Sequence, residues 1–193
     1  MPQTKVGNRI KQMPLTPLER EVIVGCLLGD GTLSQAGKYY RLRVEHTSKH
    51  WEYVEWKFEL LKRLCLSEAN HVAAHASLRF GTVGHPSIAQ LRNAWYRPNK
   101  QVPPNLVLTS LMVAIWFMDD GTKHRDTVDI SVHNFSECDL QILRDQLLNK
   151  YNVRTTVNSD AKGHRLYVIK ESYPDFKKLV KPYIVECMAY KLP

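Results

Sequence analysis

Two short stretches of the sequence place an acidic residue directly before glycine at the end of an apolar run. The apolar residues 24–28 lead into Asp30 and Gly31, and residues 113–118 lead into Asp120 and Gly121. A carboxylate is unfavourable at the C-terminus of a helix, where the macrodipole is negative and the last carbonyls lack N–H partners. A divalent cation beside such carboxylates would remove this cost, and an oxygen-only ligand set suits Mg²⁺. The alternative is that each aspartate only shapes a turn; its presence at both positions favours metal binding.

The first acidic stretch ends a well-marked helix. Thr16 is a natural N-cap, Pro17 suits the first helical position, and Glu19 completes a capping box. The apolar run that follows is interrupted by Gly25, and Gly25 and Gly29 fall on one face of the helix. We therefore expect a partner helix to approach closely at this face.

The order of predicted elements then repeats. A strand at 38–48, a helix capped by Ser48, strands within 71–83 and a helix at 86–96 follow the first acid. After a helix at 109–119, the second copy has a strand at 127–133, a helix capped by Ser136, two further strands and a helix after Ser172. Both copies close on a lysine shortly before a proline, at Lys100 and Lys191. The repeat predicts two halves related by a pseudo-two-fold axis, with their acid-ended helices packed together.

This repeat sets the expected domain boundaries. We predict a flexible basic arm at 1–14, a first half at 15–100, a linker in the proline-rich residues 101–108 and a second half at 109–193.

Charge and strand pattern favour a nucleic-acid partner. The net charge is +8 with a pI near 9.3, of which residues 1–108 carry +7 and residues 109–193 carry +1. In the strand at 38–48 one face is polar and largely basic, as an antiparallel sheet with one solvated side would have. In the strand at 127–133 we expect valine and isoleucine inward and Thr127, Asp129, Ser131 and His133 outward. The candidate DNA-contacting residues are Lys38, Arg41, Arg43, His75, Arg79, Lys123, Ser131, His133, Arg154, Asn158 and Arg165.

Other classes of protein fit the sequence poorly. The four cysteines have no zinc-knuckle spacing, and the eight histidines form no metal-ligand pattern. No apolar stretch reaches transmembrane length, so no membrane partner is expected. Reduced thiols indicate an intracellular protein, with bacterial cytoplasm and organelle both open.

The two acidic motifs together carry a family resemblance. The segments "IVGCLLGDG" at 23–31 and "VAIWFMDDG" at 113–121 resemble those of a LAGLIDADG homing endonuclease of the single-chain, two-motif kind. The lead-in "VPPNLVLTSL", the segment "WFMDDGTKH" and the ending "LVKPYIVECMAYKLP" are also similar to this family's second half, so the resemblance covers nearly the whole chain beyond residue 14. Motif two departs from the pattern in having Ile115 where the family's first glycine would fall.

The resemblance implies an α+β fold of two αββαββα halves, with the motif helices at their interface and a saddle of antiparallel sheets for DNA. It implies a monomer that cuts both strands of a long double-stranded DNA site with Mg²⁺, for which Mn²⁺ should substitute. Carried over by position, Asp30 and Asp120 bind the metals, with help from the backbone carbonyls of Gly29 and Asp119. Lys100 and Lys191 match the basic residues that flank the active sites.

Two rival functions stay open on the same fold. One is an intron maturase, an RNA-splicing cofactor whose partner would be intron RNA. The other is a non-catalytic DNA-binding regulator, which the retention of both acids disfavours. The sequence has no splicing-domain signals, so intron encoding and intron homing are expected rather than an intein context.

Overall fold

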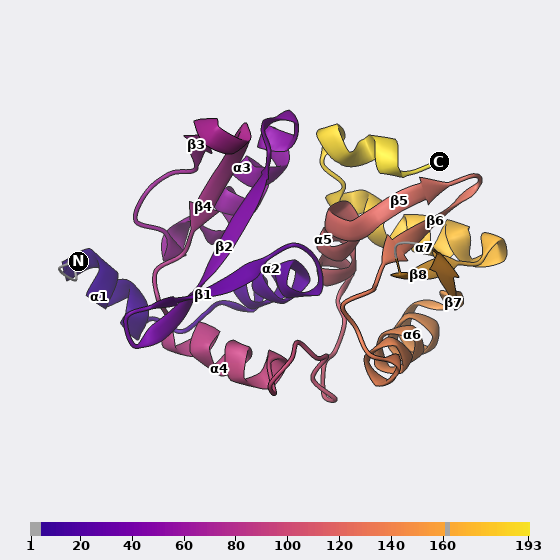
Figure 1. Cartoon of the computed structure of the whole chain (residues 1–193), viewed down its shortest axis with the longest axis horizontal. Helices are drawn as coiled ribbons and strands as arrows, with labels where there is room; N and C mark the ends of the chain where they lie inside the picture. The colour runs from indigo at the N-terminus through magenta and orange to yellow at the C-terminus, as the bar shows by residue number, and fades with distance from the viewer. Residues whose placement is uncertain (1–4, 161–162) are drawn as a thin grey trace. The chain divides into compact units, whose positions relative to one another are not determined.

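Two units of the chain, Met1–Ala94 and Trp95–Pro193, repeat one order of elements in the computed structural model (Figure 1). The structure describes residues 5–160 and 163–193. After an extra helix α1 (Lys5–Gln12), the first unit consists of α2 (Pro17–Leu28), β1 (Thr32–Ala36), β2 (Tyr39–Thr47), α3 (Trp51–Leu61), β3 (Asn70–Val72), β4 (Ser77–Gly81) and α4 (Pro86–Trp95), whose last residue is the first of the second unit. The second consists of α5 (Ser110–Asp120), β5 (Gly121–His124), β6 (Thr127–Ser131), α6 (Glu137–Tyr151), β7 (Thr155–Asp160), β8 (Gly163–Val168) and α7 (Tyr173–Val180). The predicted αββαββα order is confirmed in both units.

Each unit contains one four-stranded antiparallel sheet. The strand orders are β1-β2-β4-β3 and β5-β6-β8-β7, so the two sheets have the same topology. In the first unit α3 packs on β2 and β4, over the apolar face that Leu42 and Val44 form. In the second, α5 lies against β6 and α6 against β7. Alternation along the strands therefore leaves the other face of each sheet to polar side chains.

Helix α2 begins as its sequence predicts. Thr16 and Glu19 form the expected capping box, with Pro17 in the first turn. Arg63 extends it, because its guanidinium donates to both carboxylate oxygens of Glu19. Burial acts to raise the pKa of Glu19, but the hydrogen bonds from Arg63 and Thr16 outweigh it and hold this pKa below its ordinary value. The start of α2 is thus tied to the 3₁₀ turn that follows α3.

Part of the segment expected to be a loose basic arm is helical. Lys5–Gln12 form α1, whose Gly7 and Ile10 are buried, while Lys5 and Arg9 are exposed and Lys11 is half-buried. Gly7 and Ile10 are three residues apart, so they lie on one side of this short helix and form its buried face. Residues 1–4 lie outside the described residues. The predicted limits of the halves and linker, and the pairing of the two acid-ended helices, stay predictions.

Among the described residues, no helix combines the length and the apolar character that crossing a membrane requires.

The two serines predicted to cap the middle helices behave differently. Ser136 is the N-cap of α6 and forms a capping box with Asp139. Ser48 does not cap α3, because the chain first makes a 3₁₀ turn over Ser48–His50 and α3 starts only at Trp51. The prediction for Ser48 was wrong, since sequence alone does not distinguish a cap from the start of a 3₁₀ turn.

This difference predicts unequal effects of alanine at matched positions. We expect Ser136→Ala to lower the free energy of unfolding by about 1 kcal/mol through loss of the cap, and Ser48→Ala to change it far less. Urea denaturation of both variants measures this. An equal loss in both would contradict the assignment of the caps.

Candidate functional site

Both acidic motifs lie at the junction between a core helix and the first strand of its sheet: a three-residue turn joins α2 to β1, and α5 is followed directly by β5. The N–H of Gly31 donates to the carbonyl of Cys26 at 2.8 Å, and the N–H of Gly121 donates to the carbonyl of Phe117. A Cβ at Gly31 would lie 2.6 Å from the Cβ of Cys26, and one at Gly121 would collide with the ring of Phe117. Close approach therefore requires glycine at both junctions.

The two junctions are not identical. Helix α2 ends at Leu28 with Gly29 as its C-cap, so Asp30 lies outside the helix, whereas α5 continues through Asp120. The Asp30 side chain is 51% exposed, and both aspartates at the end of α5 are half-buried. The carboxylates are thus accessible at helix ends that are otherwise apolar.

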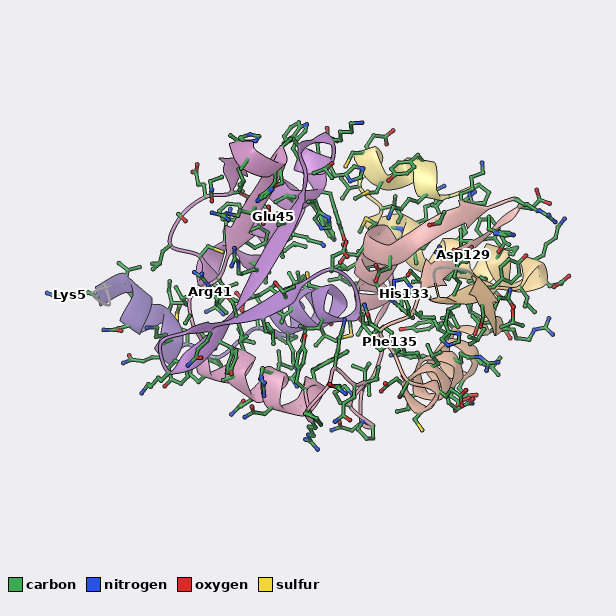
Figure 2. All side chains as sticks on the ribbon, in the orientation of Figure 1. Lys5, Arg41, Glu45, Asp129, His133 and Phe135 are labelled. Carbon is green, nitrogen blue, oxygen red and sulfur yellow. The ribbon has the colours of Figure 1, made fainter. Side chains whose placement is uncertain are left out.

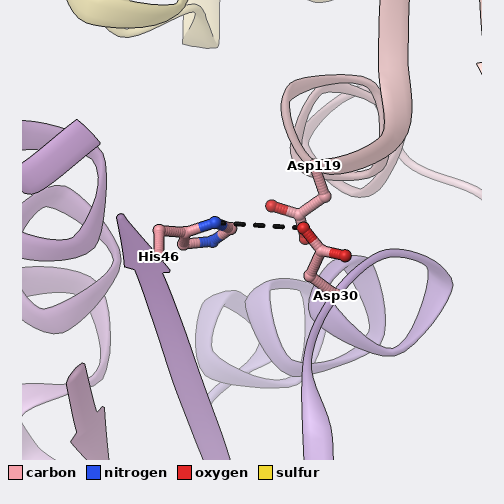
Figure 3. A group of neighbouring side chains, drawn as sticks. All are labelled: Asp30, His46 and Asp119. Carbon is pink, nitrogen blue, oxygen red and sulfur yellow. Dashed lines mark ion pairs between the residues drawn. The ribbon is translucent and has the colours of Figure 1, made fainter. Parts of the chain in front are cut away.

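Asp30 belongs to a network that the sequence did not suggest (Figure 3). The Nδ1 atom of His46, near the end of β2, lies 3.9 Å from Oδ2 of Asp30. On the other side of the imidazole, Nε2 lies 3.2 Å from the Nζ atom of Lys57 in α3. Lys57 is fully buried, and its position between Val54 and Leu61 on the apolar face of α3 is the signal that could have revealed it. Figure 3 also draws Asp119 of the second unit.

Lys191 contacts the end of α5, as a basic residue beside the acid should. Its Nζ donates to the backbone carbonyls of Met118 and Asp119, the latter at 2.9 Å. These are last-turn carbonyls that the helix itself leaves without N–H partners. The carbonyl of Asp119, predicted as a metal ligand, thus already accepts a hydrogen bond, and a bound cation would have to share that oxygen with an ammonium group.

Lys100 lies in the second unit, in the loop after α4. Tyr96 and Lys100 form an isolated antiparallel bridge, and the Lys100 Nζ lies 5.1 Å from the ring centroid of Phe135. Its amino group therefore has an aromatic neighbour of its own unit.

In the first unit, the predicted basic face is confirmed. Register places Arg43 beside Gly81, and Arg79 between Glu45 and Asn70, on the face opposite Leu42 and Val44. A depression of about 190 Å³ lies on this face, and three arginines line it: Arg41, Arg43 and Arg79. The rest of its lining is Ser67, Asn70, Phe80 and Gly81. In Figure 2, Arg41 and Glu45 lie along β2. Several arginines and an amide on one sheet face are suited to phosphates and base edges.

The second sheet corrects one expectation. Asp129, expected to be solvated, is 6% exposed, because Arg165 of β8 bonds its carboxylate through Nε and Nη2. His124 lies 3.3 Å from the same carboxylate, and Arg165 also donates to Thr122. Thr127, expected outward, is buried too and donates to the carbonyl of Val168. Both predictions were wrong because the partners, Arg165 and Val168, lie in β8, far along the chain, and the alternation within residues 127–133 gives no sign of them.

The remaining candidates are scattered over several local settings. Asn158 lies opposite Arg165, and Ser131 bonds the ring of His133. Lys38 is exposed in the turn between β1 and β2, and exposed His75 lies in a 3₁₀ turn. Arg154 was wrongly assigned to a strand: it precedes β7 and lines a pocket with residues of α6. Lys123 is exposed but pairs with Val128, which places it on the opposite side of the pleat from Thr122.

The donors at the two helix ends are suited to a hard divalent cation. They are accessible carboxylates with backbone carbonyls beside them, which is the ligand type that Mg²⁺ and Mn²⁺ share. The Asp30 and His46 ligand atoms lie within 4.8 Å of each other, so the first unit also offers one nitrogen.

Comparison with known proteins agrees with this architecture. The profile of the LAGLIDADG DNA endonuclease family matches residues 20–176. The cytochrome b mRNA maturase bI2 of Debaryomyces hansenii is 29% identical over 196 residues, 91% of this chain and 75% of the relative. The DNA endonuclease I-ChuI of Chlamydomonas applanata is 29% identical over 210 residues, 93% of this chain and 96% of the relative.

A solved structure has the same fold. The homing endonuclease I-WcaI bound to its DNA recognition sequence aligns with a TM-score of 0.85 and 23% sequence identity, over 100% of this chain and 94% of that one.

The close approach at the acidic junctions predicts a stability effect. Gly121→Ala should lower the free energy of unfolding by roughly 1–3 kcal/mol, because the new methyl group overlaps Phe117. Gly81→Ala is the control, since its Cβ would come no closer than 3.4 Å to any neighbour. Thermal denaturation compares them, and a Gly121→Ala protein as stable as the Gly81→Ala protein would show that the junction can relax.

Proposed function

Because this chain belongs to the LAGLIDADG DNA endonuclease family, we propose that it is a site-specific endonuclease that makes a double-strand break in a long DNA site. The observation that carries the proposal is the acidic junction, which occurs once in each unit at the foot of a buried helix. One carboxylate for each strand of a duplex is the simplest use of two such junctions.

We assign Mg²⁺ as the cofactor, held by the carboxylates of Asp30 and Asp120 with the carbonyls of Gly29 and Asp119. When bound, a divalent cation stabilises charge on the phosphoryl oxygens and lowers the pKa of a coordinated water. Two carboxylates supply the negative charge that holds such a cation. Mn²⁺ should support cleavage as well, because it accepts the same oxygen donors.

The lysines supply fixed positive charge. The last carbonyls of α5 accept hydrogen bonds from Lys191, which hold its ammonium group beside the acidic junction. Little side-chain entropy is then lost when this group faces a phosphate. Lys100 is assigned the corresponding role beside the other strand.

DNA binding is assigned to the polar faces of the two sheets. The arginines of the first sheet point away from its apolar core, where they can contact phosphates and guanine edges. In the second sheet Arg165 is held by Asp129, which fixes its guanidinium in one direction. The protein is expected to act as a monomer, since it contains two acidic junctions in one chain.

A second function, RNA splicing, is favoured by one observation: a relative that aligns with 91% of this chain is a maturase. Splicing of an intron RNA in the presence and absence of the protein tests it.

Loss of either acid should abolish double-strand cleavage. We expect Asp30→Asn and Asp120→Asn to lower the cleavage rate on the order of a thousandfold or more, with the dissociation constant for the site nearly unchanged. The DNA substrate is first identified by incubating a genomic DNA library with the unmodified protein and Mg²⁺ and sequencing the cut sites.

Asp119→Asn is the matched control, because it keeps the backbone carbonyl and changes only the neighbouring carboxylate. Cleavage by Asp119→Asn but not by Asp120→Asn assigns the metal to Asp120, and the reverse moves it to Asp119. Full cleavage by both Asp30→Asn and Asp120→Asn would refute the site.

DNA binding should weaken steeply with salt, because phosphate contacts release counterions. We expect Arg43→Gln to reduce the slope of log Kd against log salt concentration by about one, and Arg20→Gln, on the exposed side of α2, to leave it unchanged. Fluorescence anisotropy over a salt series measures both. A flat salt response in the unmodified protein contradicts the assigned surface.

A further inference from the structure

Helix α1 has a charge distribution that is unfavourable for a helix by itself. Lys5 is its first residue, where the macrodipole is positive, and its first turn contains no acid. Arg9 lies on the same side of the helix, and two like charges at this spacing destabilise a helix by about 0.2–0.5 kcal/mol. The sequence has no acidic residue before Glu19, and that carboxylate is bound by Arg63. The exposed side of α1 is therefore suited to an external anion.

The two faces of α1 differ in the chemistry that they offer. Gly7 and Ile10 form the buried face. With about 3.6 residues per turn, the opposite face is the one that carries Lys5 and Arg9. The exposed side chains of this face can all donate hydrogen bonds: Lys5, Asn8, Arg9 and Gln12. Ammonium, guanidinium and amide groups are the donors that proteins use on the phosphates of DNA.

The segment that follows α1 is fixed to the first unit by two side chains. The N–H of Ser87 donates to Nδ1 of the buried His85 at 3.1 Å, so the ring proton of His85 lies on Nε2. This Nε2–H donates to the carbonyl of Met13 at 2.9 Å. Arg63 donates to the next carbonyl, that of Pro14, also at 2.9 Å. Two consecutive carbonyls are thus held, and they give α1 a fixed place on the unit.

His85 also places α1 at one end of the first sheet. Its backbone N–H donates to the carbonyl of Tyr40, at the start of β2, at 2.9 Å. Helix α1 therefore ends close to the hairpin that joins β1 to β2, and Figure 1 shows the helix beside this hairpin. Exposed Lys38 lies in the turn of the hairpin, and Arg41 and Arg43 follow it along β2. Basic side chains thus continue from the sheet to α1.

We propose that α1 binds the phosphate backbone of duplex DNA next to the segment that the first sheet contacts. The inference rests on the proposed function, because it adds contacts to the same duplex. Contacts with phosphates fix the position of a protein on DNA but carry no sequence information. Lys5 and Arg9 therefore contribute to affinity, and the choice of the site is left to the sheets.

A salt series measures the contribution of α1. We expect the double variant Lys5→Gln/Arg9→Gln to reduce the slope of log Kd against log salt concentration by about two, one for each lost phosphate contact. Glutamine has nearly the helix propensity of lysine and arginine, so thermal denaturation should be unchanged. The duplex is the selected site, and fluorescence anisotropy is recorded without Mg²⁺ so that the DNA stays intact.

Lys178→Gln/Lys181→Gln is the matched control. It removes two exposed lysines of the second unit that lie outside the surfaces assigned to DNA, and it should leave the slope unchanged. An equal reduction of the slope by both double variants would show a general effect of net charge and would overturn the proposal.

Selection of cut sites from the genomic DNA library gives a second measurement. The Lys5→Gln/Arg9→Gln protein should cut at the same positions and with the same base preferences as the unmodified protein. An unchanged salt slope, an altered base preference, or a slope reduced on double-stranded RNA but not on DNA would overturn the proposal. If the unmodified protein binds duplex DNA but does not cut it, the proposed function fails, whereas the salt series still decides whether α1 contacts the duplex.

Discussion

The arrangement depends on how tightly the chain folds back on its own helix at Gly31 and Gly121. In the second unit the helix becomes strand without an intervening residue, and in the first only Gly29, Asp30 and Gly31 separate α2 from β1. A residue one position earlier has little conformational freedom, so its side chain is fixed at the edge between the apolar core and the solvated sheet. An acid in that position is exposed enough to bind a cation and rigid enough to bind it in one place.

The two units meet this constraint by different means. The first has its acid beyond the helix end, with an imidazole and a buried ammonium behind it. The second has its acid on the helix itself, and a lysine from near the end of the chain neutralises the last carbonyls. The basic side chains are also unequal, since the first sheet carries three arginines around one depression while Arg165 of the second is balanced by Asp129. An internal repeat has thus retained its backbone while its side chains diverged.

Local signals predicted what depends on neighbours in the chain. The capping boxes at Thr16 and Ser136 and the alternation along β2 each lie within a few residues, and the structure confirms them. Strand β1 has no apolar alternation, so it was not predicted. The burial of Asp129 and Lys57 also escaped prediction, because each depends on a partner elsewhere in the fold, Arg165 on another strand and His46 on β2. Site residues are prone to this failure, since a buried charge is tolerated only with a partner that topology supplies.

If the second sheet contacts DNA as proposed, the ion pair between Asp129 and Arg165 constrains how the protein could acquire a new target. Arg165 belongs to the surface proposed to contact DNA, and exchanging it alone would leave the buried carboxylate of Asp129 with only His124 beside it, at a cost of about 3–5 kcal/mol. A change of target at this strand therefore requires substitution of both Arg165 and Asp129. Engineered libraries should vary both positions together, and natural drift toward a new sequence here must cross a destabilised intermediate.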